Sequence, residues 1–230
     1  MVRVKAEEFL RRLGSSTATV QESEGILLDC KKVKGSYSSR IQITYIDLKL
    51  ARVSRKNADY SWFDVIQKKM RESLFSGKMP AVKIKYDMNR VENIEFLKDV
   101  ELTKVLEIID AIADKDEKYK YVDIEGKFID QDTSCEVRSG NSGSVVLPYS
   151  LLSVQLLKDH LHGKAIKATI IGHESNGNII DAFILREIAE SEERESKEEE
   201  ITAEAETEEK LELPTDKQKL VDELLAEIKT

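Results

Sequence analysis

Residues 189–213 constrain the fold most, because this segment is too acidic to enter a packed core. It contains the runs Glu-Ser-Glu-Glu-Arg-Glu-Ser-Lys-Glu-Glu-Glu and Ala-Glu-Ala-Glu-Thr-Glu-Glu, and it has no aromatic residue. Such a segment buries too little apolar surface to offset the entropy lost on ordering it. We therefore predict a disordered acidic tether, extended by its own charge repulsion, and expect the folded domains to end near residue 188.

Charge is distributed unevenly over the whole chain. Residues 1–90 carry 19 basic and 10 acidic side chains, net +9, whereas residues 91–188 carry 11 and 18, net −7. The remaining residues, 189–230, carry 6 and 16, net −10. A basic front, a mildly acidic middle and a strongly acidic end indicate three regions with different roles.

Composition excludes several classes of protein. Forty per cent of the residues are hydrophobic, which is enough for a folded core. No apolar run approaches the roughly 18 residues that a membrane helix needs, and the N-terminus lacks a secretory signal pattern. The two cysteines, Cys30 and Cys135, are too few for a disulfide framework. We therefore expect a cytoplasmic protein that does not associate with membranes.

The front of the chain, residues 1–115, is predicted to be a basic α+β domain. Apolar residues recur every three or four positions where we expect helices, at residues 2–13, 60–74 and 95–113. Alternating apolar residues predict strands at 25–33, 40–50 and 82–86. The apolar phase switches at Tyr45 and Ile46, which predicts a bulge or a strand that is buried on both faces.

Residues 118–188 are predicted to form a small, β-rich, barrel-like domain. The pattern indicates strands at 119–130, 133–138 and 144–147, a helix at 149–161, and strands at 164–172 and 178–187. Asn176-Gly177 is a strong signal for a hairpin between the last two strands. Five strands with a helix between the third and the fourth are the order of an OB-fold, whose barrel binds single strands.

The run from Val137 to Pro148 supports a second interpretation of this domain. It reads Val-Arg-Ser-Gly-Asn-Ser-Gly-Ser-Val-Val-Leu-Pro, with a Gly-Asn-Ser turn at 140–142, and Gly163-Lys164 opens a later strand. This pattern resembles the AbrB/SpoVT swapped-hairpin family, which includes MazE-type antitoxins and AbrB-like proteins of archaeal transposons.

The resemblance covers residues 133–188 and implies an intertwined homodimer. It also implies contact with DNA through Arg138, Asn141 and Ser142, although Tyr149 stands where the family usually has a basic residue. The OB-like barrel remains the alternative, and a structural barrel that binds no nucleic acid is the third interpretation.

Basic clusters in the front predict binding to nucleic acid, and of the two kinds we expect DNA rather than RNA as the partner. Tyr37, Tyr45, Tyr60 and Trp62 lie among them, and aromatic side chains next to cations suit backbone contact with base stacking. The candidate binding residues are Lys31, Lys32, Lys34, Arg52, Arg55, Lys56, Lys68, Lys69 and Arg71.

The last residues, 214–230, are predicted to form a short amphipathic helix. Thr215 and Gln218 have the spacing of a capping box, and an apolar stripe follows at Leu220, Val221, Leu224, Leu225 and Ile228. A helix of about 14 residues is marginal alone, so it needs a surface. This surface is either a partner protein's groove or the chain's own domain.

These features predict a non-enzymatic, nucleic-acid-binding accessory or regulatory protein. The alternative is an oligomeric scaffold or adaptor of the plasmid or virus type, which binds only protein. We predict no catalytic residue, no cofactor and no metal site. The three histidines, His160, His162 and His173, lack supporting ligands, and the chain has neither a P-loop nor a dinucleotide fingerprint.

Overall fold

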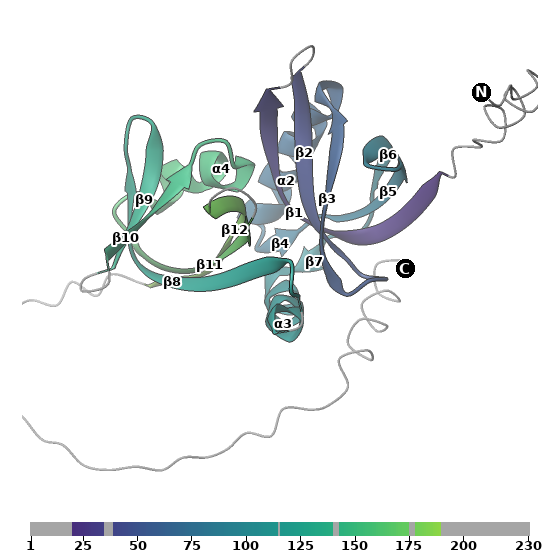
Figure 1. Ribbon diagram of the computed structural model, residues 1–230. Helices are drawn as coiled ribbons and strands as arrows, with labels where there is room; N and C mark the ends of the chain where they lie inside the picture. The colour runs from purple at the N-terminus through teal and green to yellow at the C-terminus, as the bar shows by residue number, and fades with distance from the viewer. Residues whose placement is uncertain (1–19, 35–38, 115, 140–142, 175–177, 190–230) are drawn as a thin grey trace, which may run out of the picture. The chain divides into compact units, whose positions relative to one another are not determined.

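The structure, a computed structural model, describes residues 20–34, 39–114, 116–139, 143–174 and 178–189 (Figure 1). Contacts within the chain divide it into two compact units, with the boundary between Leu102 and Thr103. The prediction of an α+β chain is confirmed, since each unit combines a five-stranded sheet with helix. The helix predicted at 2–13, Tyr37, the acidic tether and the C-terminal helix lie outside the described residues.

The first unit is a closed five-stranded barrel. Its strands are β1 (Gln21–Lys34), β2 (Ser39–Asp47), β3 (Arg52–Asp59), β5 (Ala81–Asp87) and β6 (Arg90–Phe96), and they close in the order β1-β2-β3-β6-β5. Neighbouring strands are antiparallel except β3 and β6, which pair in parallel at Asn57 and Arg90. This arrangement is compatible with an OB-like fold.

A helical segment separates the third barrel strand from the fourth. It consists of the 3-10 turn η1 (Tyr60–Trp62) and the helix α2 (Phe63–Phe75). After α2 the short strand β4 (Lys78–Met79) pairs with β7 (Val100–Glu101). The helix predicted at 60–74 is therefore present, with its first turn in 3-10 form.

The backbones of the first two barrel strands approach each other closely at Gly25. Leu27 lies opposite Tyr45, and both side chains are buried. A Cβ atom on Gly25 would lie 2.2 Å from the Ile46 carbonyl oxygen, so only glycine fits at this position. Tyr45 and Ile46 are both fully buried, which confirms burial on both faces of β2 at the phase switch. The irregular register lies on the partner strand, between Leu27 and Asp29.

The sequence pattern does not predict β3 or β6, and it begins the third helix too early. Only Val53 and Ala58 are buried on β3, so this strand has no apolar alternation and depends on its pairing with β2. Strands β6 and β7 occupy much of residues 90–101, and the helix predicted at 95–113 begins at Leu102 instead. This helix is α3 (Leu102–Ala113).

The second unit repeats this succession of strands and helix in an open sheet. Its strands are β8 (Tyr119–Asp130), β9 (Ser134–Ser139), β10 (Gly143–Pro148), β11 (Ala165–Glu174) and β12 (Asn178–Ala189), in the order β10-β9-β8-β11-β12. The helix α4 (Leu152–Leu161) lies between the third and fourth strands in the chain. The five strands and the helix predicted from the sequence are therefore confirmed. In the part of the chain that the structure describes, no ladder joins β10 to β12.

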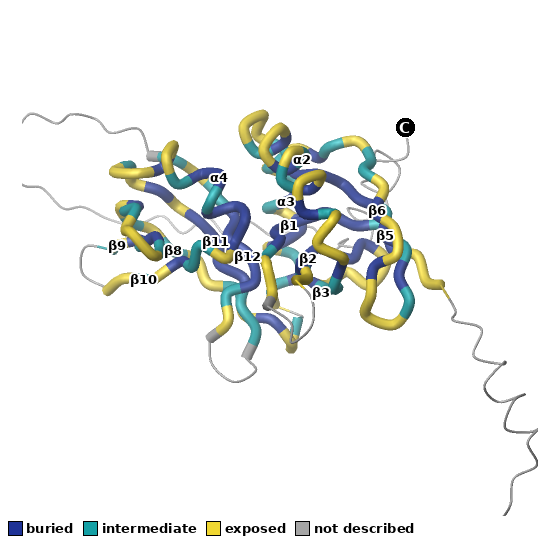
Figure 2. The backbone as a smooth tube through the Cα atoms, turned by 90° about the horizontal axis from the view of Figure 1, so that it is seen from above, coloured by how far each residue is buried: buried dark blue, intermediate teal, exposed yellow. Residues whose placement is uncertain are grey.

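The core of the second unit lies between α4 and the sheet. Figure 2 shows the buried and exposed positions along each element. The buried core residues include Phe128, Cys135, Val137, Leu147, Leu151, Val154, Leu157, Leu161, Ile166 and Phe183. Arg186 connects α3 to the sheet, because its guanidinium group pairs with Asp110 and lies 3.3 Å from a carboxylate oxygen of Asp123.

Candidate nucleic-acid interface

A row of four polar side chains crosses the outside of the first barrel. The register places Lys31 of β1 opposite Gln42 of β2, which in turn lies opposite Asn57 of β3. Asn57 pairs with Arg90 of β6. Residues that pair across neighbouring strands point to the same face of a sheet, and none of these four is buried. We call Lys31, Gln42, Asn57 and Arg90 the outer row.

Two arginines extend this polar face on either side of the outer row. Arg40 lies two positions before Gln42 on β2, and Arg55 lies two positions before Asn57 on β3. Residues two apart on a strand share a face. With the outer row they place four cations and two side-chain amides on one strand face. We call these six residues the outer face.

A pocket of about 330 Å³ lies at one end of the outer face. Its lining residues are Arg40, Asn57, Ala58, Asp59, Asp87, Met88, Asn89 and Arg90. Hydrogen bonds from Ser61 lower the pKa of the Asp59 carboxyl group, and the charges of Arg90 and Arg40 act in the same direction. The pocket therefore combines two guanidinium groups with two carboxylates, and the charge of the Asp59 carboxylate is stabilised by both arginines.

The loop between β5 and β6 is tied to the third strand beside this pocket. Lys56 donates a hydrogen bond from Nζ to the Met88 carbonyl oxygen at 2.8 Å, and the Asn57 amide donates to the Asn89 carbonyl oxygen at 2.9 Å. Met88 has a φ of 50° and an 83 % exposed side chain. A non-glycine residue in this conformation is strained, and such strain concentrates at functional sites.

The structure brings some of the predicted cations to the outer face and directs others elsewhere. Lys31 and Arg55 belong to the face. Lys56 anchors the loop instead, with its Nζ also 3.6 Å from the centre of the Tyr86 ring. Lys32 lies 4.1 Å from the centre of the Phe63 ring, at the start of α2.

The remaining predicted cations of the first unit occupy three different places. Arg52 is exposed at the start of β3, opposite Asp47, and Lys34 ends β1, its side chain being outside the description. Lys68 and Arg71 are exposed on α2. Lys69 forms an ion pair with Asp99 at 2.9 Å.

The predicted aromatic residues contribute little exposed surface. Tyr45 is buried in the barrel, and this burial raises the pKa of its hydroxyl group. Tyr60 is 38 % exposed and stacks on Phe63 with 5.6 Å between the ring centroids. Trp62 is half-buried. Contact through cations and amides is therefore better supported here than stacking on rings.

The second unit holds the cation that the family resemblance singles out. Arg138 is exposed on β9 and donates from Nε and Nη2 to one carboxylate oxygen of Glu136, at 3.0 Å and 2.8 Å. These hydrogen bonds lower the pKa of the Glu136 carboxyl group. The charge of Arg138 is thus already compensated, while Asn141 and Ser142 lie outside the described residues.

A polar cluster next to α4 is the place where catalysis could be sought. The Tyr149 hydroxyl donates to Asp130, whose carboxylate lies 3.6 Å from the Lys158 amino group. Burial raises the pKa of the Cys135 thiol to about 11, so this thiol is protonated at neutral pH and is not an activated nucleophile. His162 accepts a hydrogen bond from the Asp130 amide at 3.0 Å, which gives it a structural role.

Sequence reasoning missed Arg40, Gln42, Asn57 and Arg90. The sequence could have indicated Arg40 and Gln42, because they alternate with the apolar Ile41 and Ile43 and therefore face outward. Arg90 carries no such signal, since it reaches Asn57 only through the parallel pairing of β3 with β6.

The described residues show neither a metal site nor a membrane-spanning helix. Within the described ranges, no group of three His, Cys, Asp or Glu residues is placed to hold a metal ion. The helices described there are also too short or too polar to cross a membrane. The partner-binding residues predicted between 220 and 228 lie outside the residues that the structure describes.

No protein-family model matches the chain, and no curated protein matches it. The role of the outer face is therefore argued from its geometry.

Proposed function

We propose that the protein binds nucleic acid and that the outer face of the first barrel is its binding surface. The observation that supports this is the gathering of four cations and two amides on one strand face, with a pocket at its end. Lys and Arg neutralise phosphates, which dominate affinity, and Gln and Asn amides can hydrogen-bond to base edges. The role is accessory or regulatory, without catalysis.

A single strand is the ligand that best fits this surface. OB-folds bind oligonucleotides on the face of their second and third strands and through the loop between the fourth and fifth. In the first barrel the outer face lies largely on β2 and β3, and the loop tied to it joins β5 to β6, the fourth and fifth strands of that barrel. We infer an OB-like fold for both units, and we propose DNA rather than RNA as the ligand of the outer face.

Salt dependence of binding tests this proposal. Affinity of the full chain for a fluorescent dT oligonucleotide should fall with a slope of log K against log salt of about −3, since each single-strand phosphate contact contributes about −0.7. Arg40→Ala with Arg90→Ala should reduce the slope by about half. An RNA oligonucleotide of the same length tests the choice of DNA.

A matched control lies on α2, where Lys68→Ala with Arg71→Ala removes the same amount of charge from exposed positions. This control should keep most of the affinity. Equal weakening by both pairs would contradict a defined surface, and no binding at low salt would leave the scaffold role as the better proposal.

The swapped-hairpin family is the competing proposal for the second unit. It requires a dimer whose unfolding depends on protein concentration, because an intertwined protomer lacks its own core. Sedimentation of the full chain at micromolar concentration separates the two proposals. A stable monomer supports the OB-like fold, and a concentration-dependent dimer supports the swapped hairpin.

A further inference from the structure

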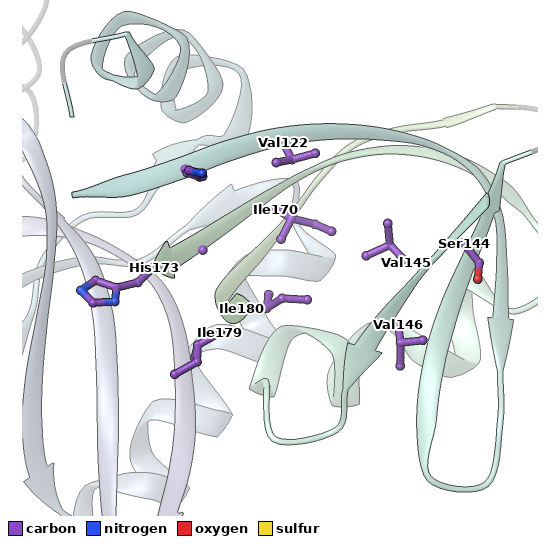
Figure 3. Close-up of a pocket in the computed structure, with 10 residues that line it drawn as sticks. Val122, Ser144, Val145, Val146, Ile170, His173, Ile179 and Ile180 are labelled. Atoms are coloured by element: carbon purple, nitrogen blue, oxygen red, sulfur yellow. The ribbon is translucent and has the colours of Figure 1, made fainter. Parts of the chain in front are cut away.

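An apolar groove follows the open seam of the second unit. It has a volume of about 520 Å³, and Figure 3 shows Val145 of β10 and Ile180 of β12 pointing into the gap between these strands. The apolar lining comes from four strands and consists of Val122, Val145, Val146, Ile170, Ile179 and Ile180.

The exposed apolar side chains of the second unit gather at this groove. Val122 is 50 % exposed, Val146 is 56 % exposed and Ile179 is 39 % exposed. These are the large hydrophobic residues counted as exposed in the described part of that unit, and all three line the groove. Contiguous exposed apolar surface marks a binding site. The polar lining residues are Lys120, Ser144 and His173, with no carboxylate among them.

The C-terminal residues of the same chain have the chemistry of an occupant. Leu220, Leu224 and Ile228 recur every four residues, and Val221 and Leu225 widen the stripe. A helix in a groove is recognised through anchors at this spacing. Because so short a helix is marginal in water, an apolar surface is needed to stabilise it.

The length of the intervening chain fits the distance to be crossed. Strand β12 lines the groove at Ile180 and ends nine residues later at Ala189, so its end lies roughly 30 Å along the strand from the groove. Residues 190–214 would have a root-mean-square length of about 25–30 Å as an uncharged flexible coil, and charge repulsion lengthens this segment further, so it can reach the groove. Effective concentration is greatest when the length of a linker matches its span.

We propose that residues 215–229 dock as an amphipathic helix into the groove of their own chain. The anchors Leu220 and Leu224 cover the apolar side chains of β8, β10 and β12, and the docked helix occupies the seam that no strand ladder closes. This inference does not depend on nucleic-acid binding by the first barrel.

Cross-linking within the full chain tests the proposal. Val122→Cys with Leu224→Cys places one thiol in the groove and one on the stripe, and a short bismaleimide reagent then joins them. The native Cys30 and Cys135 are 1 % and 0 % exposed, so they do not compete. We expect monomeric cross-linked product to form at least ten times faster than with Glu125→Cys and Leu224→Cys. Glu125 is exposed on β8 an odd number of positions from Val122, and therefore on its opposite face.

Each further result either supports or overturns intramolecular docking. Adding Leu220→Asp and Ile228→Asp should slow the groove cross-link to the rate of the control. Val145→Cys, whose side chain packs against the core from β10, repeats the measurement from the other side of the seam, should Val122→Cys disturb folding. Equal rates for groove and control positions would overturn the proposal. Cross-linked dimers that disappear on dilution would assign the groove to the tail of a second copy and overturn docking within one chain.

Discussion

The two units share one succession of elements, three strands, a helix and two strands, but only the first closes into a barrel. In the first unit a single parallel pairing, Asn57 with Arg90, joins the third strand to the fifth. Lys56 ties the neighbouring loop to the same strand. In the second unit the corresponding strands, β10 and β12, are not paired within the described residues, and an apolar groove lies between them.

The difference teaches that strand order alone does not determine what such a unit can bind. Closure turns the apolar side chains of the first unit inward and leaves a polar outer face for a charged ligand. The open seam of the second unit leaves apolar side chains in contact with solvent, which suits a hydrophobic partner segment. One chain therefore carries two unlike surfaces, one polar and one apolar, on two units with the same succession of elements.

The largest expected effect comes from the glycine in the first strand of each unit. A Cβ atom on Gly25 or on Gly126 would lie 2.2 Å from a backbone carbonyl oxygen, of Ile46 and of Arg138 respectively. Gly25→Ala and Gly126→Ala should each lower the free energy of unfolding by about 3 kcal/mol, because backbone must move to make room. Hydrogen exchange should show the loss of protection in the substituted unit only.

Gly172→Ala is the matched control for these two variants. Its Cβ atom would lie 3.2 Å from the Ile179 carbonyl oxygen, so a small shift accommodates it and the cost should stay under about 1 kcal/mol. Equal loss of protection in both units from either first-strand variant would show that the units do not unfold separately.

The second expected effect concerns closure itself. Lys56→Met removes the hydrogen bond to the Met88 carbonyl oxygen and the contact with the Tyr86 ring, and should cost about 1.5 kcal/mol. Amide exchange should accelerate in β5 and β6 and remain unchanged in the second unit. Lys68→Met on α2 should stay within about 0.5 kcal/mol of the wild type. Unchanged exchange in β6 would mean that Lys56 does not hold the barrel closed.

The third expected effect is a loss of stability at alkaline pH, to which the two buried thiols contribute in different units. Burial raises the pKa of Cys135 to about 11, above the ordinary value of 9.0. The protonated thiol therefore stabilises the second unit fully below about pH 9, and this contribution is lost as pH rises towards 11. At pH 10 the free energy of unfolding of the wild type should therefore be about 1 kcal/mol lower through this thiol than at neutral pH. Cys135→Val should not show this loss, which urea unfolding at the two pH values measures.

Cys30 provides the comparison in the first unit. Its burial raises the pKa of the thiol further, with the negative charge of Asp29 acting in the same direction. The first unit should therefore keep its alkaline sensitivity in the Cys135→Val variant. Identical pH profiles for the variant and the wild type in the second unit would rule out this contribution of Cys135.

The smallest expected effect comes from the tip of the loop between β5 and β6. Met88→Gly relieves a φ of 50°, and the gain should exceed the entropy cost of glycine by about 0.5 kcal/mol. The melting temperature should rise slightly, while affinity for the dT oligonucleotide should fall if the exposed methionine contacts a base. A rise in stability without any change in affinity would limit Met88 to a structural role.

The sequence predicted the second unit better than the first, and the reason lies in how each strand is stabilised. The strands of the second unit carry apolar residues at alternate positions, and the Asn176-Gly177 pair marks its last hairpin. In the first unit β3 has almost no apolar alternation, so its position depends on register with β2. The open seam could not be predicted, since a missing ladder between distant strands leaves no local pattern.

The candidate site was predictable only in part for the same physical reason. Clusters of lysine and arginine along the chain identified the basic front, but neighbours in a strand point to opposite faces. Arg55 therefore reaches the outer face while Lys56 anchors a loop. Only the pairing of four strands shows which cations share a surface, and Arg90 joins them from a segment whose sequence gave no indication of it.

Gly25 and Gly126 have a consequence for tracing the ancestry of this chain. Each lies in the first strand of its unit, where any side chain would collide with the backbone of a neighbouring strand. Every change of their codons that alters the amino acid adds a Cβ atom, so selection should tolerate almost none. They therefore offer two fixed points, one in each unit, for aligning the halves of this protein with each other and for recognising distant descendants of the same gene.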